Sequence, residues 1–383
     1  MYLKTNRKYK SQVQTITSTD LLDLPEAGLV SAIKLDFRAT AAANINTAAR
    51  RKIADRLTKI EVTDGGTKTM FSLTGQEAKA LSLYALGKTQ PEYNGVLAAQ
   101  ILRSSITIPF GEYIGDPKRA LDLSAYDQVS LELTNDASAT QYTSGTQTVD
   151  VSLLTLEDLA AKPVEYYKHY QWKANKPAAA GQYVNHALPT TEKIRRYFIQ
   201  VDPDLAATDA MTNDPAIDTS NVRFSFLAGK EIVVNARPFD VFAENAAKYG
   251  LVDTDGLFVD SATVYVDTML AYVQAITFSP TSATTSTVIT AEDVMSILQT
   301  RMQLMTNIGT GTTTPAQSMV RARGIGYLHT MCLFDAMGGD PALFLDPAKT
   351  GSGKGPVELE WYCATADHTV RSCLTVPMKN GEA

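Results

Sequence analysis

The sequence predicts an all-β fold that consists of two tandem antiparallel sandwiches, each with about eight strands. Three observations support this prediction. Short runs rich in Val, Ile, Leu, Thr and Tyr alternate with turns that contain Gly, Asn or Asp. No regular strand–helix alternation of the kind that builds a parallel sheet occurs. One set of landmarks occurs twice, in the same order, along the 383 residues.

The clearest landmark is a turn followed by a strand. Phe110–Asp122 returns as Phe334–Asp346, and the Phe, the Gly-Asp-Pro and the Leu-Asp keep their relative positions without a gap. A strand-like run follows each copy, at Val129–Leu133 and at Val357–Trp361. The repeat therefore predicts the same turn and the same strand in two similar domains.

A β-hairpin is predicted upstream of each turn. Lys59–Leu73 alternates apolar and polar residues on either side of Asp-Gly-Gly, and Val222–Val234 has the same form around Ala-Gly. Glycine supplies the positive φ that a tight hairpin turn requires. The two hairpin glycines, Gly66 and Gly229, are 163 residues apart.

A short helix is predicted after each hairpin. The helical patterns span Gln76–Leu86, which stops at Gly87, and Phe239–Tyr249, which stops at Gly250. Glycine commonly follows a helix because it adopts the left-handed conformation, and Pro238 stands where a helix start favours proline. These two glycines are also 163 residues apart.

Strands open and close each copy. The opening strands are Ile33–Phe37 and Tyr197–Val201, and the closing strands are Val149–Leu156 and Val370–Val376. Because six landmarks recur in one order, the sequence indicates that the same domain occurs twice. Eight-stranded sandwiches are commonly jelly rolls, so we expect a double jelly roll with short helices on the connections.

These landmarks divide the chain into four parts. We expect a basic N-terminal arm at 1–25, the first jelly roll at 26–160, a linker at 161–190 and the second jelly roll at 191–383. The second copy is longer between its helix and its Gly-Asp-Pro, which predicts a loop insertion at about 253–317. The insertion contains a Thr/Ser/Ala stretch and a helical pattern over 292–305.

The N-terminal segment is basic, whereas the whole chain has a net charge of −6. Lys4, Arg7, Lys8 and Lys10 precede the first acidic residue, Asp20. One interpretation is an arm that contacts phosphate, either of lipid head groups or of a packaged genome. The other is a solvated, poorly ordered terminus. The negative charge argues against nucleic-acid binding by the body of the protein.

The repeated Gly-Asp-Pro predicts a turn. Proline fixes φ at the first corner, and the preceding Asp accepts a hydrogen bond from the backbone N–H two residues further on. The alternative is a calcium loop, but one carboxylate per loop is too few to define a site, so the metal stays unknown and structural calcium has no supporting motif. The residues concerned are Gly115, Asp116, Pro117, Gly339, Asp340 and Pro341.

The residues that an enzyme needs are scarce. Only four histidines occur, with no His-x-His pair and no local metal motif, so we expect neither catalytic residues nor a cofactor. Cys332, Cys363 and Cys373 form no C-x-x-C pair and suit buried thiols made in a reducing cytoplasm. No apolar run is long enough to cross a membrane, and no signal peptide is expected at the N-terminus.

An aromatic stretch, Glu165–Trp172, lies between the two copies. Tyr and Trp are enriched in interface cores, so this stretch could contact a neighbouring subunit. It could equally pack the linker onto the sandwiches. Both interpretations stay open from the sequence.

The region around the first Gly-Asp-Pro resembles a known family. Ser105–Pro117 contains an Ile-Pro-Phe-Gly strand and a Gly-Asp turn, and Leu121–Leu133 approaches the next strand through Leu-Asp-Leu-Ser-x-Tyr. These segments resemble the double jelly-roll major capsid proteins of tailless icosahedral phages of the corticovirus and finnlakevirus type, which have an internal membrane. The second copy departs from the pattern, with Met331–Leu333 in place of the Ile-Pro strand.

This resemblance implies a structural capsid protein and no enzyme. It implies homotrimers that form pseudo-hexameric capsomers of an icosahedral virion, assembled from chains made in the host cytoplasm. The implied partners are neighbouring capsomers, penton and minor capsid proteins, and an internal lipid membrane through the N-terminal arm; sequence-specific nucleic acid is not among them. Two alternatives stay open: a receptor-binding spike or adhesin, and a two-jelly-roll glycan hydrolase with a carboxylate pair between its sandwiches.

Overall fold

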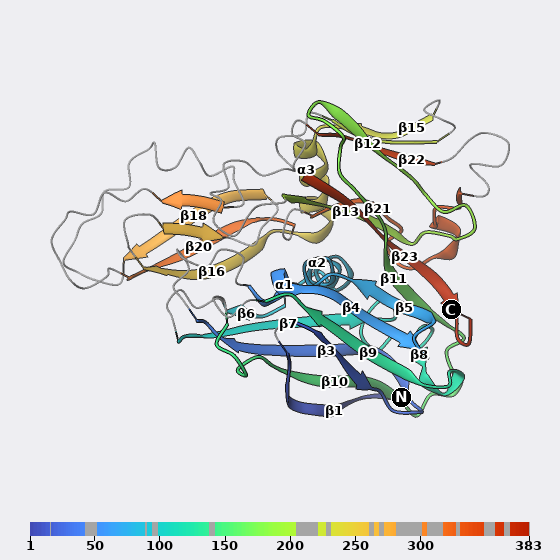
Figure 1. Cartoon of the computed structure of the whole chain (residues 1–383). Helices are drawn as coiled ribbons and strands as arrows, with labels where there is room; N and C mark the ends of the chain where they lie inside the picture. Colours follow the sequence, from blue (N-terminus) through green and yellow to red (C-terminus); the bar gives the residue numbers. More distant parts are fainter. Residues whose placement is uncertain are drawn as a thin grey trace.

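The computed structural model describes most of the chain. The residues described are 1–15, 17–42, 52–88, 90–93, 99–137, 142–203, 221–226, 231–259, 264–267, 272–280, 301–304, 317–326, 330–347, 357–363 and 368–382. Among them, no helix is long and apolar enough to span a bilayer. They form two sandwiches that are joined by a shared sheet (Figure 1).

The first sandwich has eight principal strands. One of its sheets has the order β1-β10-β3-β7, extended by β6 (Glu92–Tyr93) and with β8 (Leu121–Asp122) paired to β3, and the other follows β2-β9-β4-β5. Counted along the chain, these orders are first–eighth–third–sixth and second–seventh–fourth–fifth, which is a jelly roll. The strands are β1 (Tyr2–Val13), β2 (Thr19–Asp23), β3 (Leu29–Thr40), β4 (Leu57–Asp64), β5 (Lys68–Leu73), β7 (Ile101–Pro109), β9 (Val129–Asn135) and β10 (Thr148–Glu157).

The second sandwich repeats this topology strand for strand. Its sheets follow β11-β23-β13-β21 and β12-β22-β14-β15, which are again first–eighth–third–sixth and second–seventh–fourth–fifth. The expectation of an all-β double jelly roll is thereby confirmed. The strands are β11 (Glu165–Asn175), β12 (Gln182–Ala187), β13 (Arg196–Pro203), β14 (Val222–Phe226), β15 (Glu231–Ala236), β21 (Thr330–Asp335), β22 (Glu358–Cys363) and β23 (His368–Lys379).

Two segments that we expected outside the sandwiches belong to them, because each segment contains the first two strands of one sandwich. The expected arm at 1–25 contains β1 and β2, and the expected linker at 161–190 contains β11 and β12. β1 pairs with β10 from Tyr2↔Glu157 to Val13↔Thr148, so it is part of a sheet. The charged sequence of β1 hides the strand because β1 lies at a sheet edge, where nearly all of its side chains are exposed.

The hairpins and helices lie where the sequence predicts them. β4 pairs with β5 and β14 with β15, both antiparallel. Helix α2 (Gly75–Leu86) begins with a capping box in which Thr74 and Glu77 bond each other's backbone N–H groups, and it ends at Gly87 with φ 65°. Helix α3 (Pro238–Tyr249) begins with its proline and ends at Gly250, whose φ is 79°.

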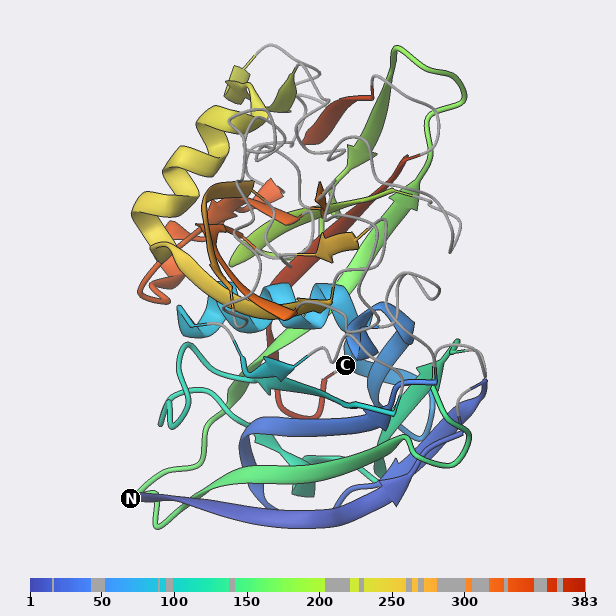
Figure 2. The ribbon, with the colours of Figure 1, turned by 90° about the vertical axis from the view of Figure 1, so that its left-hand side faces the viewer.

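The two jelly rolls share one eight-stranded sheet. Its order is β2-β9-β4-β5-β11-β23-β13-β21, so four strands of the first copy continue directly into four strands of the second. The link is a short parallel pairing of β5 with β11, through Phe71↔His169 and Ser72↔Tyr170. Helix α2 lies between the two sandwiches in both views (Figure 1; Figure 2). The core around α2 includes Phe198, Cys332 and Cys373 of the second copy, so the boundary itself is a packed core.

The insertion in the second copy contains its own strands. β16 (Val252–Val259), β20 (Gln317–Ile325) and β18 (Tyr272–Pro280) form a three-stranded sheet that projects to one side of the molecule in Figure 1. β17 (Val264–Asp267) pairs with β19 (Arg301–Leu304). β19 occupies the end of the helix predicted over 292–305. The rest of that helix, and nearly all of the Thr/Ser/Ala stretch, fall outside the described residues.

Candidate functional site

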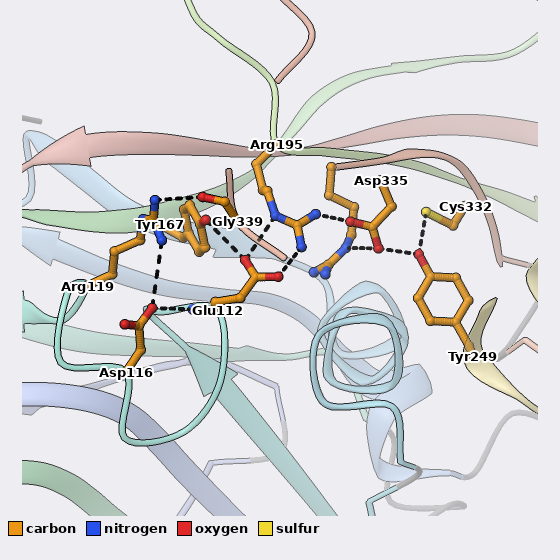
Figure 3. Close-up of polar contacts among 10 residues, drawn as sticks. Glu112, Asp116, Arg119, Tyr167, Arg195, Tyr249, Cys332, Asp335 and Gly339 are labelled. Carbon is orange, nitrogen blue, oxygen red and sulfur yellow. Dashed lines mark hydrogen bonds and ion pairs between the residues drawn. The ribbon is translucent and has the colours of Figure 1, made fainter. Parts of the chain in front are cut away.

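The two Gly-Asp-Pro loops meet at the boundary between the jelly rolls. The first loop follows β7 and contributes Glu112, Asp116 and Arg119; the second follows β21 and contributes Gly339 (Figure 3). They form a buried polar cluster, which we call the ionic junction, together with residues from β11, the start of β13, β21 and helix α3. These residues are Tyr167, Arg195, Arg196, Asp335 and Tyr249. The two copies of the repeated Gly-Asp-Pro loop therefore contact each other in the folded chain.

Arg195 is the centre of the ionic junction. Its Nε donates to Glu112 Oε2 at 3.0 Å and its Nη2 donates to Glu112 Oε1, which makes the pairing bidentate. Its Nη1 donates to Asp335 Oδ1. The Arg195 side chain is 2% exposed and that of Asp335 is 1% exposed. One guanidinium therefore joins a carboxylate of the first jelly roll to a carboxylate of the second.

The ionic junction continues from Asp335 toward helix α3. Arg196 Nε donates to Asp335 Oδ2 at 3.2 Å, and the Tyr249 hydroxyl donates to the same oxygen. The Tyr249 hydroxyl also lies 3.2 Å from Cys332 Sγ. Both oxygens of Asp335 are thus occupied, as the burial of a carboxylate requires.

On its other side the ionic junction contains an arginine stacked on a tyrosine. The Arg119 guanidinium lies 5.0 Å from the centre of the Tyr167 ring, and its Nη2 donates to the Gly339 carbonyl at 3.0 Å. The Tyr167 hydroxyl donates to Glu112 Oε2 at 3.1 Å. Arg119 Nη1 lies 3.9 Å from Asp116 Oδ2. The carboxylates around Arg119, Arg195 and Arg196 are those of Glu112, Asp116 and Asp335, together with the more exposed Glu165, whose Oε2 lies 3.8 Å from Arg119 Nε.

At Gly339 any other residue would be strained and also crowded. Its φ is 66°, and a Cβ there would lie 3.0 Å from Glu112 Oε2, 3.1 Å from Arg119 Nη1 and 3.2 Å from Tyr167 OH. Gly115, in the first loop, has φ 92° but no atom within 4 Å of a Cβ. The two glycines therefore share a conformational requirement, and only Gly339 has a packing requirement as well.

The aspartates of both turns accept backbone hydrogen bonds. Asp116 Oδ1 accepts from Lys118 N at 2.9 Å and Asp116 Oδ2 accepts from Glu112 N at 3.0 Å. Asp340 Oδ1 accepts from Ala342 N at 2.9 Å, and Pro341 begins a 3₁₀ turn; Pro117 follows Asp116 in the first loop. In the described parts of the chain, no three His, Cys, Asp or Glu side chains are arranged to hold a metal ion.

The electrostatics of the ionic junction favour permanent ion pairs. Burial alone would raise the pKa of Glu112, but the hydrogen bond and charge of Arg195, with the charge of Arg196, lower it overall. Glu77, whose carboxylate caps α2, has a pKa that burial raises. Glu112 thus stays ionised and bonded to arginine at neutral pH, an arrangement that holds the two jelly rolls together.

A neutral histidine also bridges the boundary. His169 of β11 lies between Pro109 O, 2.8 Å from Nε2, and Thr375 Oγ1, 2.9 Å from Nδ1. A carbonyl oxygen can only accept, so Nε2 carries the proton and Nδ1 accepts from the threonine. Burial lowers the pKa of His169 to about 3. The aromatic stretch Glu165–Trp172 is therefore strand β11, packed between the sandwiches.

The remaining candidate residues lie away from the ionic junction. Lys4, Arg7, Lys8 and Lys10 are exposed on β1, where Arg7 approaches Asp150 at 4.0 Å. Because β1 is hydrogen-bonded to β10, a sheet strand and not a flexible arm carries these side chains. The three cysteines are buried free thiols, as expected.

Sequence reasoning found the glycines and aspartates of the loops and missed the charges between them. Glu112 and Arg119 lie inside the repeated segment, and two consecutive arginines, Arg195 and Arg196, stand at the start of β13, directly before the apolar run Tyr197–Ile199. A charged pair at the start of a buried strand is the one local signal that a buried acid, here Asp335, must lie nearby.

Solved structures share this fold. No family model and no curated protein matches the sequence. The STIV MCP crystal structure is 10% identical, with a TM-score of 0.56 over 99% of this chain and 97% of that chain. A chain of the Sulfolobus turreted icosahedral virus structure is 10% identical, with a TM-score of 0.55 over 98% and 90%. A chain of the PBCV-1 virus capsid is 10% identical, with a TM-score of 0.51 over 98% of this chain and 93% of that chain. These likenesses show a common double jelly-roll fold over almost the whole chain.

Proposed function

We propose that this chain is a structural major capsid protein, which assembles as homotrimers into the shell of an icosahedral virion. The observation that carries the proposal is the extent of the match: both jelly rolls and their mutual placement correspond to the STIV MCP, which is a major capsid protein, over nearly the full length of both chains. The PBCV-1 capsid chain supports the same assignment.

The geometry of the fold suits this role. Two jelly rolls of the same topology lie side by side in one chain, so three chains around an axis present six similar sides. Such a capsomer tiles a shell as a hexamer does and uses only three chains. The ionic junction fixes the two jelly rolls relative to each other, as a rigid tile requires. The sheet formed by β16, β20 and β18 is our candidate for the tower on the outer surface.

The hydrolase alternative has less support. It requires two reachable carboxyl groups with opposed pKa shifts, and Glu77 and Glu112 do have opposed shifts. Glu77 is fully buried, however, and its Oε2 accepts from Thr74 N at 2.8 Å. A glycan cannot reach that carboxyl group, so this pair gives the hydrolase no support. We propose, from the likeness to structural capsid proteins, that the protein is not an enzyme. The spike alternative predicts a stalk with short repeats, and the sequence contains no such repeats.

We further propose that the capsomers contact one another and the penton and minor capsid proteins. The exposed lysines of β1 are the residues we propose for contact with an internal lipid membrane, through lipid phosphate. The body of the protein is acidic overall and recognises no specific nucleic-acid sequence.

The proposal is tested by the native mass of the purified chain, with negative-stain images of the same sample. We expect particles of three 41.5 kDa chains with a hexagonal outline. A monomer at micromolar concentration would overturn the homotrimer and, with it, the capsomer. A trimer with an elongated stalk would instead support the spike.

A further inference from the structure

The contact between the two jelly rolls uses one edge from each. The first copy contributes β5, its fifth strand, and the second copy contributes β11, its first strand. The corresponding strands, β15 of the second copy and β1 of the first, each end their sheets. Both views place β1 at the opposite end of the molecule from α3 (Figure 1; Figure 2).

The pairing registers show which residues of β1 and β11 correspond. In the first copy Leu35 and Arg7 lie on either side of β10, paired to Val151 and Ser152. In the second copy Ile199 and Gln171 lie on either side of β23, where Ile199 pairs with Ser372 and Gln171 pairs with Cys373. This alignment places Thr5 and Asn6 of β1 where β11 has His169 and Tyr170, the two residues that pair with β5. The sequence retains a trace of the correspondence, Tyr-x-Lys at 2–4 and at 166–168.

The same alignment identifies the partner residues on β15. The hairpins correspond with an offset of 163 residues, which places Val234 and Asn235 where β5 has Phe71 and Ser72. Asn235 is exposed, and so is Ile232 on the same strand. Asn6, its counterpart on β1, is exposed as well.

The two corresponding helices differ in what covers them. One face of α2 is buried against the second jelly roll, where Tyr84 packs on Phe198 with ring centres 5.7 Å apart. The corresponding face of α3 is exposed, and Phe239 at its start is 58% exposed. The buried face of α2 consists of Glu77, Ala80, Leu81 and Tyr84, and the corresponding exposed face of α3 consists of Asp240, Ala243, Glu244 and Ala247.

Charge complementarity indicates what covers the face of α3. By the same correspondence, its partner is the outer face of sheet β1-β10-β3-β7. That face carries four cationic side chains around two aspartates, Asp36 and Asp150, and so has an excess of positive charge. The exposed face of α3 offers Glu244, together with Asp240, which also pairs with Arg237 at 3.6 Å. Opposite charges of this kind favour one docking orientation over others. The four cations are Arg7, Lys34, Arg38 and Arg103.

Exposed apolar residues occupy two further matching positions. Within the chain, Arg119 stacks on Tyr167. The corresponding residues are Leu343, which is 58% exposed, and Leu3, which is 41% exposed. Neither leucine has to face water if a second copy brings Leu343 onto Leu3.

We propose that the β15 edge and the exposed face of α3 dock on the β1 edge and the outer face of β1-β10-β3-β7 in a second copy of this chain. β15 then extends the neighbouring sheet in parallel, with Asn235 beside Asn6, as β5 extends to β11 within the chain. The contact is head-to-tail, and it closes into a ring when three chains repeat it around the threefold axis of the proposed capsomer. This inference rests on the proposed capsomer and specifies its subunit interface.

Engineered disulfides test the inference. The variant with Asn6→Cys and Asn235→Cys is oxidised with diamide and run on a non-reducing gel. Adjacent strands lie about 4.8 Å apart, which is within reach of a disulfide. We expect most of the chain to run as a covalent trimer that returns to monomer on reduction. The three native cysteines are buried and do not interfere.

The matched control pairs Asn6→Cys with Tyr183→Cys. Tyr183 is exposed on β12, the opposite edge of the same sheet as β15, and should give no covalent ladder. A native trimer in which the Asn6/Asn235 pair fails to cross-link would overturn this interface and leave the capsid role standing. A native monomer would overturn both. Equal cross-linking of the control pair would also contradict the inference.

Discussion

Arg195 and Glu112 form a bidentate ion pair across the boundary between two jelly rolls that the sequence repeats in tandem, with Nε 3.0 Å from Oε2. The same guanidinium also bonds Asp335 of its own jelly roll. Because Arg195 serves both carboxylates, its removal would leave two acids without their main partner in a desolvated place.

We expect Arg195→Met to lower the free energy of unfolding by about 3–5 kcal/mol, since breaking a buried ion pair from one side leaves uncompensated charge. Urea denaturation at pH 7 measures the change. The matched control is Arg223→Met, because Arg223 pairs with Glu360 at 3.4 Å in a half-exposed position and should cost about 1 kcal/mol or less. Equal losses in the two variants would contradict the central role of Arg195.

Alanine at the two turn glycines should separate conformational strain from crowding. Gly115→Ala introduces only a left-handed alanine, which costs about 1–2 kcal/mol. Gly339→Ala has the same strain and also displaces Glu112, Arg119 and Tyr167, so its melting temperature should fall further. If the two variants have the same melting temperature, the close approach at Gly339 has no energetic consequence.

The buried histidine predicts acid sensitivity. His169 has a folded-state pKa of about 3, against an ordinary value near 6.5, so below pH 6.5 the unfolded chain binds a proton that the folded chain refuses. The contribution of His169 to the free energy of unfolding is fully present above pH 6.5. It falls by up to about 1.4 kcal/mol per pH unit as the pH decreases toward 3.

His169→Gln tests this pH dependence. Glutamine retains an N–H donor for the Pro109 carbonyl and cannot become charged. We therefore expect a shallower decline of stability between pH 6.5 and 4, measured by urea midpoints at each pH. His186, whose pKa burial lowers to about 4, contributes its own decline in both proteins. An unchanged slope would show that His169 does not titrate on unfolding.

Calcium should have little effect on the turns. Both carboxylate oxygens of Asp116 already accept backbone N–H groups, and a bound cation would have to compete with them. We expect the melting temperature to be the same in millimolar calcium and in EDTA. A rise of several degrees in calcium would show a site that the Gly-Asp-Pro loops help to form.

Deletion of residues 1–12 should damage the fold itself. The deleted segment is nearly all of β1, and its loss opens the edge of β10 from Val149 to Glu157. An uncovered strand edge promotes aggregation, so we expect less soluble protein and a lower melting temperature. A stable, soluble deletion variant would mean that β1 adds little to the sheet.

The sequence predicts much of the fold, and the reasons for success and failure are local. The hairpins, α2 and α3 follow from periodicity and from glycines such as Gly87. β1 could not be predicted as a strand, because an edge strand exposes both of its faces and its sequence shows no alternation of apolar and polar residues. The ionic junction could not be predicted from the sequence, because Glu112, Arg195 and Asp335 are far apart in the chain and only the folded topology brings them together.

The position of the last strand has a consequence for synthesis. In each jelly roll the eighth strand lies between the first and the third, so no sheet of that kind is complete until its final strand arrives. The first copy can close once residues 148–157 have left the ribosome. The second must wait for β23, at 368–379, so β11 and β13 have no common neighbour until translation is nearly finished. Premature termination would therefore release a finished first half attached to an open, aggregation-prone second half.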